Sequence, residues 1–403
     1  MQMKRRDLMR MLSLGIAALP MRMSLMAAAS ESPAVRNMIV INALGGLSNQ
    51  NLWVKNVAGS NESVGRASIL RMRSIDKRAI GDTHSSGTTA INATLGYVAG
   101  PEDPYEYTID DIAEWNAIIR QYPDDLLKVW TADDILRAKK ENRTGIIFGF
   151  QNAKSVGNKT ERIKTFANLG VRIIQLTYND RNQIGDGSVV KENKGITKFG
   201  YEVIEALNEN RVLVDLSHSG ERTCLDAVRA SSSPITISHT GCRALNDIPR
   251  NKTDEEMRLV AEKGGVVGIY FMPFLRADGQ ARTIDVVQHI EHAIKVCGEE
   301  HIGIGTDGDA TNIDDMEKYR NAIAGEITQR QKAGVSAAGE SNQVVPLIPD
   351  LMGPSQFQKL ADMLHGRGHS IDRIEKILGA NFLRLMRDVW PAGQTLTRSK
   401  YLV

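Results

Sequence analysis

The chain has 403 residues, with 50 lysines and arginines against 48 aspartates and glutamates, 42% hydrophobic residues and three cysteines. The formal charge of +2 disfavours a nucleic-acid-binding protein, because such domains usually carry a clustered surplus of basic residues. Three cysteines cannot form the disulfide framework of a small secreted scaffold, and the hydrophobic content is too high for a disordered chain. No apolar run reaches the roughly 18 residues that a membrane-spanning helix needs. The composition therefore predicts a soluble globular protein without a membrane span.

The N-terminus has the features of an export signal. The pair Arg5-Arg6 precedes a short apolar stretch, residues 11–20, and three alanines at 27–29 supply small residues for signal peptidase. This order is typical of a twin-arginine signal. We therefore expect residues 1–29 to be removed and residues 30–403 to form a periplasmic mature protein with a net charge of −2. Since this route carries folded proteins, the three cysteines are expected to be buried thiols.

Strand-like and helix-like segments alternate along the mature chain. Most of the strand-like segments are continuous runs of valine and isoleucine, as in strands that are buried on both faces. In chain order they cover residues 38–41, 89–95, 145–150, 171–177, 212–216, 235–238, 265–270 and 302–306. Amphipathic helices are expected over residues 109–120, 131–141, 199–210, 221–230, 254–263 and 284–297, two of them with threonine caps at Thr131 and Thr253.

The number and order of these segments predict the fold class. No glycine-rich dinucleotide fingerprint follows the first strand, which favours an α/β (β/α)8 barrel over a doubly wound sheet. No repeat or linker divides residues 30–403, so we expect a single barrel domain. Residues 308–352 are polar and loop-like and follow the last expected strand. Because loops after barrel strands surround the catalytic face, this long loop is expected to hang over the active site.

Polar side chains gather at the C-terminal ends of the expected strands, where barrel enzymes place their chemistry. Gln151 follows the third strand, His218 and His239 end the fifth and sixth, and Asp307 ends the eighth. Two imidazoles at adjacent strand ends would bind a divalent ion, and the carboxylate would orient or deprotonate its water. A single histidine at such a place is more often a structural residue. Here, two histidines stand in register with Asp307. The sequence therefore supports a metal-binding role and a structural role for them equally.

Several longer motifs are spread over nearly the whole mature chain. They include LGVRIIQLTYN at 169–179, VDLSH at 214–218, GGVVGI at 264–269, HIGIGTD at 301–307 and LGANFLRL at 378–385. Together they resemble the motifs of the renal or membrane dipeptidase family of zinc peptidases. The resemblance implies a (β/α)8 barrel and hydrolysis of a dipeptide.

The resemblance also implies roles for individual residues. In the family, two zinc ions share a bridging glutamate, and an aspartate after the last strand handles the catalytic water. By their positions, His218 and His239 correspond to the histidines of the second ion, and Asp307 corresponds to the catalytic aspartate. Arg250 corresponds to the arginine that holds the substrate carboxylate, which a guanidinium can grip with two hydrogen bonds. Tyr178 stands at the position of a family histidine that contacts the substrate.

The chain departs from the family at the first zinc site. Leu44 and Gly46 stand where the family has a histidine and an aspartate after the first strand, and Gln151 stands where it has the bridging glutamate. A carboxamide is neutral and offers one good acceptor oxygen, so it is a poor bridge between two cations. We therefore expect one zinc ion on the two histidines, completed by Gln151, the catalytic aspartate and water, or no tightly held metal.

A second group of metal-ligand residue types, Asp82-Thr83-His84, precedes the second expected strand. In an extended segment both outer side chains would share one face. Because barrel sites follow strands, we interpret this group as a surface turn.

The leading hypothesis is an exported dipeptidase-family metallohydrolase that cleaves a dipeptide or a small peptide-like amide with a metal-activated water. It leaves open whether the chain is a monomer or a homodimer. The alternative is a periplasmic non-hydrolytic binding or tailoring protein on the same barrel, similar to dipeptidase-like proteins of siderophore maturation. Amidohydrolase chemistry on lactones or cyclic amides shares the barrel, but no lysine stands at a strand end suitable for carboxylation. The metal content distinguishes the first two hypotheses.

Overall fold

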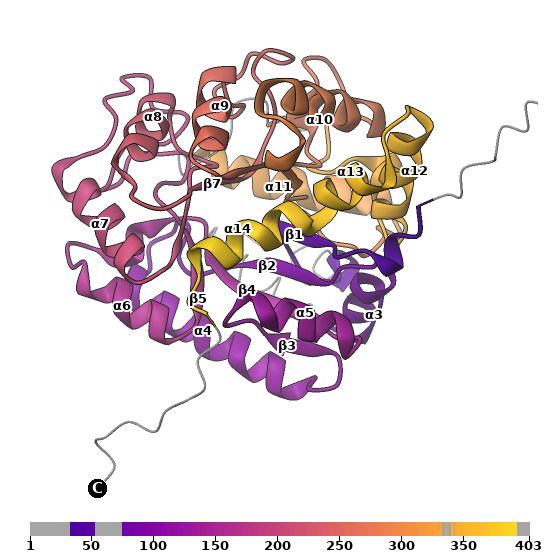
Figure 1. Cartoon of the computed structure of the whole chain (residues 1–403), viewed down its shortest axis with the longest axis horizontal. Coiled ribbons are helices and arrows are strands. Elements are labelled where there is room, and N and C mark those ends of the chain that lie inside the picture. Colours follow the sequence, from indigo (N-terminus) through magenta and orange to yellow (C-terminus); the bar gives the residue numbers. More distant parts are fainter. Residues whose placement is uncertain (1–32, 53–74, 333–335, 337–339, 342, 393–403) are drawn as a thin grey trace, which may run out of the picture. The chain divides into compact units, whose positions relative to one another are not determined.

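The computed structural model describes residues 33–52, 75–332, 336, 340–341 and 343–392 of the chain. The expected export signal, residues 1–29, lies outside the described residues. The strands and helices of the unit that begins at Pro33 are shown in Figure 1.

Eight strands follow one another around a parallel sheet in the order β1-β2-β4-β5-β6-β7-β8-β9. Each is short and buried, because helices cover the outer face and side chains fill the interior. A ninth strand in the described residues, β3 (Leu126–Lys128), pairs with β4 outside this path. The eight are β1 (Ile41–Gly45), β2 (Ala90–Leu95), β4 (Thr144–Phe150), β5 (Val171–Gln175), β6 (Leu213–Asp215), β7 (Thr236–Thr240), β8 (Val266–Ile269) and β9 (Ile302–Ile304).

The first strand and the segment after the last strand close the barrel. The Asp307 N–H donates to the Leu44 carbonyl at 2.9 Å, and the Gly46 N–H donates to the Gly308 carbonyl at 3.1 Å. Gly45 and Gly308 also form a parallel bridge. The C-terminal ends of β1 and β9 therefore lie side by side, and the predicted α/β (β/α)8 barrel is confirmed.

Helices surround the barrel and connect its strands (Figure 1). Thr131 and Thr253 begin two of them with capping boxes, as their acidic first turns predicted. None of the helices in the described residues is long and apolar enough to cross a membrane. The helices are α3 (Lys77–Ser85), α4 (Pro104–Gln121), α5 (Ala132–Lys140), α6 (Glu161–Asn168), α7 (Lys198–Glu209), α8 (Glu221–Ala230), α9 (Asp254–Glu262), α10 (Thr283–Cys297), α11 (Met316–Lys332), α12 (Gln356–Gly366), α13 (Ile371–Glu375) and α14 (Asn381–Val389).

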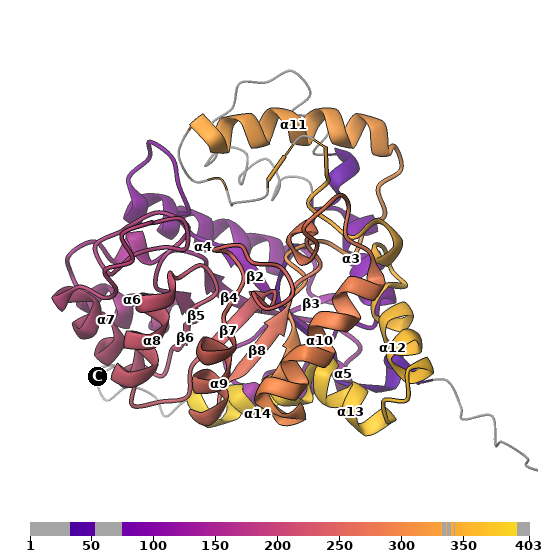
Figure 2. The same ribbon diagram turned by 90° about the horizontal axis from the view of Figure 1, so that it is seen from above.

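Residues 308–352 are not the continuous loop that the sequence suggests. They contain the 17-residue helix α11, which lies at the opposite end of the barrel from α14 (Figure 2). Tyr319, Ile323 and Ile327 form one buried face of α11 and pack with Val345 in a cluster of their own. The prediction failed because these few apolar positions stand among many charged and polar ones, so the helical period is weak.

Two smaller predictions have different outcomes. Asp82 and His84 belong to helix α3, not to a surface turn, and no group of three potential metal ligands occurs in the described part of the chain. The expectation of free thiols is confirmed, since Cys224 and Cys242 are buried and Cys297 is partly buried, all without disulfides.

Candidate active site

A cavity of about 260 Å³ lies at the C-terminal ends of the barrel strands. Five of the six predicted site residues line it, namely Gln151, Tyr178, His218, Arg250 and Asp307. His239 does not line the cavity, because it is fully buried next to His218. The segment that contains α11 contributes further lining residues, including Tyr319, Glu326, Arg330 and Glu340. Residues of the segment 308–352 therefore supply part of the lining of this cavity.

The two histidines face each other through their Nε2 atoms, which are 3.0 Å apart. They come from neighbouring elements, since β6 pairs with β7 and His218 follows β6 while His239 belongs to β7. His218 Nδ1 lies 2.7 Å from Asn179 Oδ1. Because an amide oxygen can only accept, the proton of His218 is on Nδ1 and Nε2 carries a lone pair. His239 Nδ1 has its own partner in Ser238 Oγ, at 2.8 Å.

Both imidazoles are neutral. Burial lowers the pKa of each well below its ordinary value, and the nearby cations Arg250 and Lys252 lower it further. Lys252 is itself buried and pairs with Glu256 at 3.1 Å. A neutral imidazole is the form that binds a metal ion, so the electrostatic environment keeps the pair competent to bind one.

Arg250 lies beside the histidines and is only 2% exposed. Its Nη1 donates to the Ser217 carbonyl at 2.7 Å, and its Nη2 donates to the His239 carbonyl at 3.2 Å. The same Nη2 is 3.3 Å from His218 Nε2. In the described part of the chain no carboxylate is among the hydrogen-bond partners of this guanidinium. The site thus contains a buried cation that only neutral groups position.

Tyr178 forms a wall of the cavity directly against the histidines. Its ring stacks on His218, with 4.2 Å between the ring centroids and 25° between the planes. Burial raises the pKa of Tyr178 to about 12, so the phenol keeps its proton near neutral pH and can donate a hydrogen bond.

Asp307 lines the same cavity in an uncommon backbone conformation. Its φ is 58°, a left-handed value that costs energy in a residue other than glycine and often marks a functional site. The hydrogen bond from its N–H to the Leu44 carbonyl helps to hold this conformation. Asp307 does not join the histidines in a three-ligand group, since no such group of His, Cys, Asp or Glu exists in the described residues.

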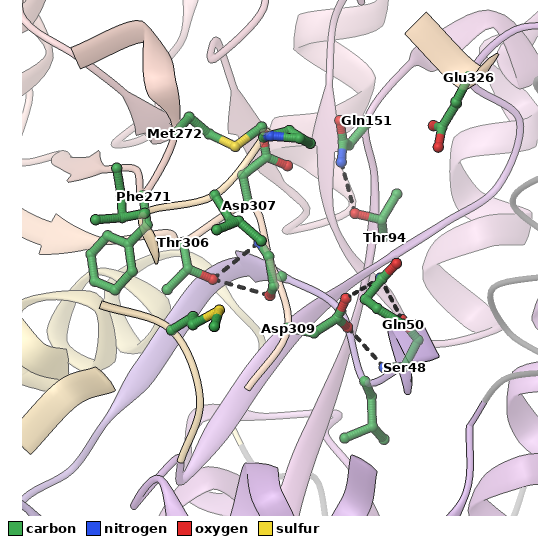
Figure 3. Close-up of a pocket in the computed structure, with 18 of the residues that line it drawn as sticks. Ser48, Gln50, Thr94, Gln151, Phe271, Met272, Thr306, Asp307, Asp309 and Glu326 are labelled. Carbon is green, nitrogen blue, oxygen red and sulfur yellow. Dashed lines mark hydrogen bonds between the residues drawn. The ribbon is translucent and has the colours of Figure 1, made fainter. Parts of the chain in front are cut away.

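Another part of the cavity wall is formed by the segments after β1 and β9. A Cβ atom on Gly46 would lie only 2.2 Å from Asp309 Oδ1. The Asp309 carboxylate accepts hydrogen bonds from the Ser48 N–H, at 2.8 Å, and from Gln50 Nε2, as Figure 3 shows. Gln151 turns its Nε2 toward Thr94 Oγ1, to which it donates at 2.7 Å. The space next to Gly46 is therefore filled by Asp309.

The histidine pair has the chemistry to hold a metal ion. Two neutral imidazoles, each with its Nδ1 held by a hydrogen-bond partner, are a typical donor pair for zinc. Their 3.0 Å separation is compatible with two Zn–N bonds of about 2.0–2.1 Å. Beside Gly46, the Asp309 carboxylate already accepts hydrogen bonds from Ser48 and Gln50. The amide nitrogen of Gln151 donates to Thr94 and is not a metal ligand.

Sequence reasoning missed three residues that orient the histidines, namely Asn179, Asp215 and Ser238. Each stands at a strand end beside a predicted site residue, so its position was visible. Its role was not, because the bonds between Asn179 and His218 and between Ser238 and Asp215 join residues from different strands.

A parallel barrel with this set of polar residues at the C-terminal ends of its strands defines a TIM-barrel metallohydrolase. The chain belongs to the membrane dipeptidase family, Peptidase family M19, whose profile matches residues 88–344. The chain is thus a metallopeptidase of the dipeptidase type.

The chain is also similar to individual relatives and solved structures. An uncharacterized dipeptidase of Schizosaccharomyces pombe is 30% identical over 239 residues, which are 56% of this chain and 57% of that protein. The crystal structure of an amidohydrolase from Pseudomonas aeruginosa is 28% identical with a TM-score of 0.72 and covers 89% of this chain and 99% of its own. The probable dipeptidase PvdM from the same organism shares the fold, with 18% identity, a TM-score of 0.65 and coverage of 88% and 96%.

Proposed function

We propose that this chain is an exported dipeptidase that hydrolyses dipeptides or small peptide-like amides with a single metal ion. The observation that carries the proposal is the neutral histidine pair beside the buried Arg250, with His218 and Arg250 both lining one cavity. A desolvated guanidinium held by neutral acceptors is suited to a carboxylate. The volume of about 260 Å³ is near the lower end for ligand sites, which suits a dipeptide better than a longer peptide.

The proposed chemistry assigns a role to each of five residues. His218 and His239 would hold the ion, which would lower the pKa of a bound water and polarise the scissile carbonyl. Arg250 binds the C-terminal carboxylate and fixes the carbonyl in place. The carboxylate of Asp307 accepts a proton as the water adds to the carbonyl carbon, and it returns that proton to the amine nitrogen as the C–N bond breaks. Tyr178 covers the histidine pair and excludes bulk water.

Zinc content and turnover of the purified chain test this proposal. We expect about one zinc per chain and hydrolysis of free dipeptides, with little hydrolysis of the same dipeptides after amidation of the C-terminus. His218→Ala and Asp307→Asn should abolish turnover. His301→Gln is a matched control, because His301 lies next to the start of β9 and bonds the Gly265 carbonyl. Turnover that survives removal of all metal would contradict the proposal.

A second candidate function is a non-hydrolytic binding or tailoring protein on the same barrel. It is favoured by the lack of a third histidine, cysteine or carboxylate ligand beside the pair in the described residues. It predicts no stoichiometric zinc after loading and no hydrolysis, together with measurable dipeptide binding by calorimetry. One zinc per chain with dipeptide turnover would exclude it.

Export is part of the proposal and has a separate test. Residues 1–29 fused to a fluorescent reporter should direct it to the periplasm through the twin-arginine route. Replacement of Arg5 and Arg6 by lysine should retain the reporter in the cytoplasm. Unchanged export of the double variant would contradict the assignment of this route.

A further inference from the structure

A buried hydrogen-bond network lies behind the two histidines and is centred on Asp215, the last residue of β6. Its side chain is fully buried. Oδ1 accepts from the Ser217 N–H at 3.0 Å, from Ser217 Oγ at 2.6 Å and from the Ser238 N–H at 3.0 Å. Oδ2 accepts from Ser238 Oγ at 2.5 Å. Burial raises the pKa of Asp215, and these four hydrogen bonds oppose that shift in favour of the carboxylate.

Counting protons along this network determines the tautomer of His239. A carboxylate can only accept, so the single hydroxyl proton of Ser238 points to Asp215. Ser238 Oγ is then an acceptor toward His239 Nδ1, which is 2.8 Å away. The proton of His239 is therefore on Nδ1, and its Nε2 carries a lone pair. The Ser217 hydroxyl is used in the same way, since it donates to Asp215 and accepts from the His239 N–H at 3.1 Å.

The tautomer matters because the two Nε2 atoms are 3.0 Å apart. That distance also suits an N–H···N hydrogen bond. If the proton of His239 moved to Nε2, it would be donated to His218 Nε2. The two imidazoles would then be hydrogen-bonded to each other and would not be open to a metal ion. Only the Nδ1–H form of both rings leaves two lone pairs directed at a common point. His218 is held in this form by Asn179, and His239 depends on Ser238.

We propose that Asp215 is a positioning residue that, through the Ser238 hydroxyl, keeps the proton of His239 on Nδ1 and so keeps the histidine pair open to a metal ion. Asp215 also joins the two strands mechanically. β6 and β7 share a single paired position, Asp215 with Thr236. The hydrogen bonds that Ser238 donates to the Asp215 carboxylate therefore replace part of the backbone hydrogen bonding that these two strands lack. The inference rests on the single-ion site proposed above, but its main test requires neither bound metal nor activity.

The substitution Asp215→Asn gives the sharpest test. The amide oxygen can still accept the three bonds made to Oδ1, whereas the amide nitrogen now donates to Ser238 Oγ. The Ser238 hydroxyl, released from Asp215, can then donate to His239 Nδ1, which places the ring proton on Nε2. Its other neighbour, Ser217 Oγ at 3.0 Å, already accepts from the His239 N–H. This isosteric change should therefore reverse the direction of the hydrogen bonds that link residue 215 to His239 through Ser238, which we call the relay, while leaving the packing intact.

The tautomer is read from two-bond ¹H–¹⁵N spectra of the metal-free full chain labelled with ¹⁵N-histidine, with the His239 signals assigned from a His239→Gln variant. We expect Nδ1–H in the wild type and in Ser238→Thr, which keeps the hydroxyl, and Nε2–H in Asp215→Asn. Zinc affinity, measured by chelator competition, should fall about 10- to 100-fold in Asp215→Asn. Asp111→Asn, a buried aspartate on α4, should change neither quantity.

Two results would overturn the proposal. The first is Nε2–H on His239 in the wild type, and the second is an unchanged tautomer in Asp215→Asn. If Asp215→Asn does not fold, Ser238→Ala replaces it, and a pure Nδ1–H signal in that variant would count against the relay. A chain that shows the expected tautomers and yet hydrolyses nothing would refute the proposed dipeptidase activity alone.

Discussion

The Asp309 carboxylate occupies the space that a side chain on Gly46 would fill, with Oδ1 only 2.2 Å from the position of a Cβ atom there. The wall of the cavity beside Gly46 is therefore filled by a carboxylate from the segment after β9, which accepts hydrogen bonds from Ser48 and Gln50 on the segment after β1. The same contact ties together the two ends of the barrel sheet.

The first prediction follows from this contact. Gly46→Ala should lower the free energy of unfolding by about 1–3 kcal/mol, as overpacking of a filled site does. The added methyl group must displace the Asp309 carboxylate from its two donors. Urea denaturation measures the effect. Gly81→Ala is the control, because a Cβ on Gly81 meets nothing within 4 Å and should be neutral or stabilising.

The double variant makes this prediction specific. In Asp309→Ala the space beside Gly46 is vacated, so adding Gly46→Ala should cost much less there than in the wild type. Equal costs in both backgrounds would show that the two residues do not interact.

The second prediction concerns Arg250. Arg250→Lys keeps the charge but removes the planar fork, and a lysine cannot reach the Ser217 and His239 carbonyls in the same geometry. We expect kcat/KM for a free dipeptide to fall about 10- to 100-fold, mostly through KM, which corresponds to one charge-assisted hydrogen bond of about 1.5–3 kcal/mol.

The matched measurement uses a dipeptide with an amidated C-terminus. If Arg250 binds the carboxylate, the variant and the wild type should treat this substrate alike. An equal loss on both substrates would assign Arg250 to folding of the site instead of substrate binding.

The third prediction concerns the pH dependence of stability. Burial raises the pKa of Asp111 to about 7, whereas an aspartate in the unfolded chain titrates near about 3.9. Between these values the folded state keeps a proton that the unfolded state releases, so the free energy of unfolding falls as the pH rises from about 4 to about 7. Above pH 7 Asp111 is ionised in both states, and the folded state carries the full free-energy cost of the buried carboxylate.

Asp111→Asn cannot ionise and should remove this dependence. Relative to the wild type, the variant should gain stability steadily from pH 4 to pH 7, up to a limit of about 4 kcal/mol. Urea unfolding at a series of pH values measures the difference. Asp110→Asn changes the exposed neighbour on the same helix and should leave the pH profile as it is. Parallel profiles for Asp111→Asn and the wild type would contradict the prediction.

The fourth prediction concerns the helix over the cavity. Arg330 on α11 pairs with Glu326 at 2.8 Å and with Glu340 at 3.0 Å, and all three side chains are largely buried. Arg330→Met would leave two buried carboxylates without their cation, a strongly destabilising change. Because the apolar contacts of α11 form a cluster separate from the main core, the loss should be local.

Hydrogen exchange of residues 316–332 measures this local loss. We expect faster amide exchange in α11 with little change in the strands of the barrel. Arg320→Met, an exposed position on the same helix, should exchange like the wild type. Faster exchange throughout the barrel would show that α11 is part of the global folding unit.

The sequence alone determined the barrel and most of the strands that build it. Strands such as β4 and β8 are continuous apolar runs, because a parallel strand is buried on both faces and its sequence records that directly. The predicted first strand, residues 38–41, was displaced, since β1 begins at Ile41. Strand β3 and helix α11 were missed, the first because it has three residues and the second because its apolar face is narrow. Most of the chemistry-bearing residues were visible for the same reason as the strands, since they stand where an apolar run ends. Arg250 lies in the segment between β7 and α9 and was indicated only by the family resemblance.

Only the tertiary structure decided what those residues can do together. It placed His239 out of the cavity and within 3.0 Å of His218, filled the space beside Gly46 with Asp309, and joined Asp215 to His239 through Ser238. The physical reason is that a strand's burial depends on its own neighbours in the chain, whereas a proton's position depends on donors and acceptors that different strands bring into contact. The sequence gives the type of each residue. Which hydrogen-bond donor pairs with which acceptor is determined only when the folded barrel brings the strands together.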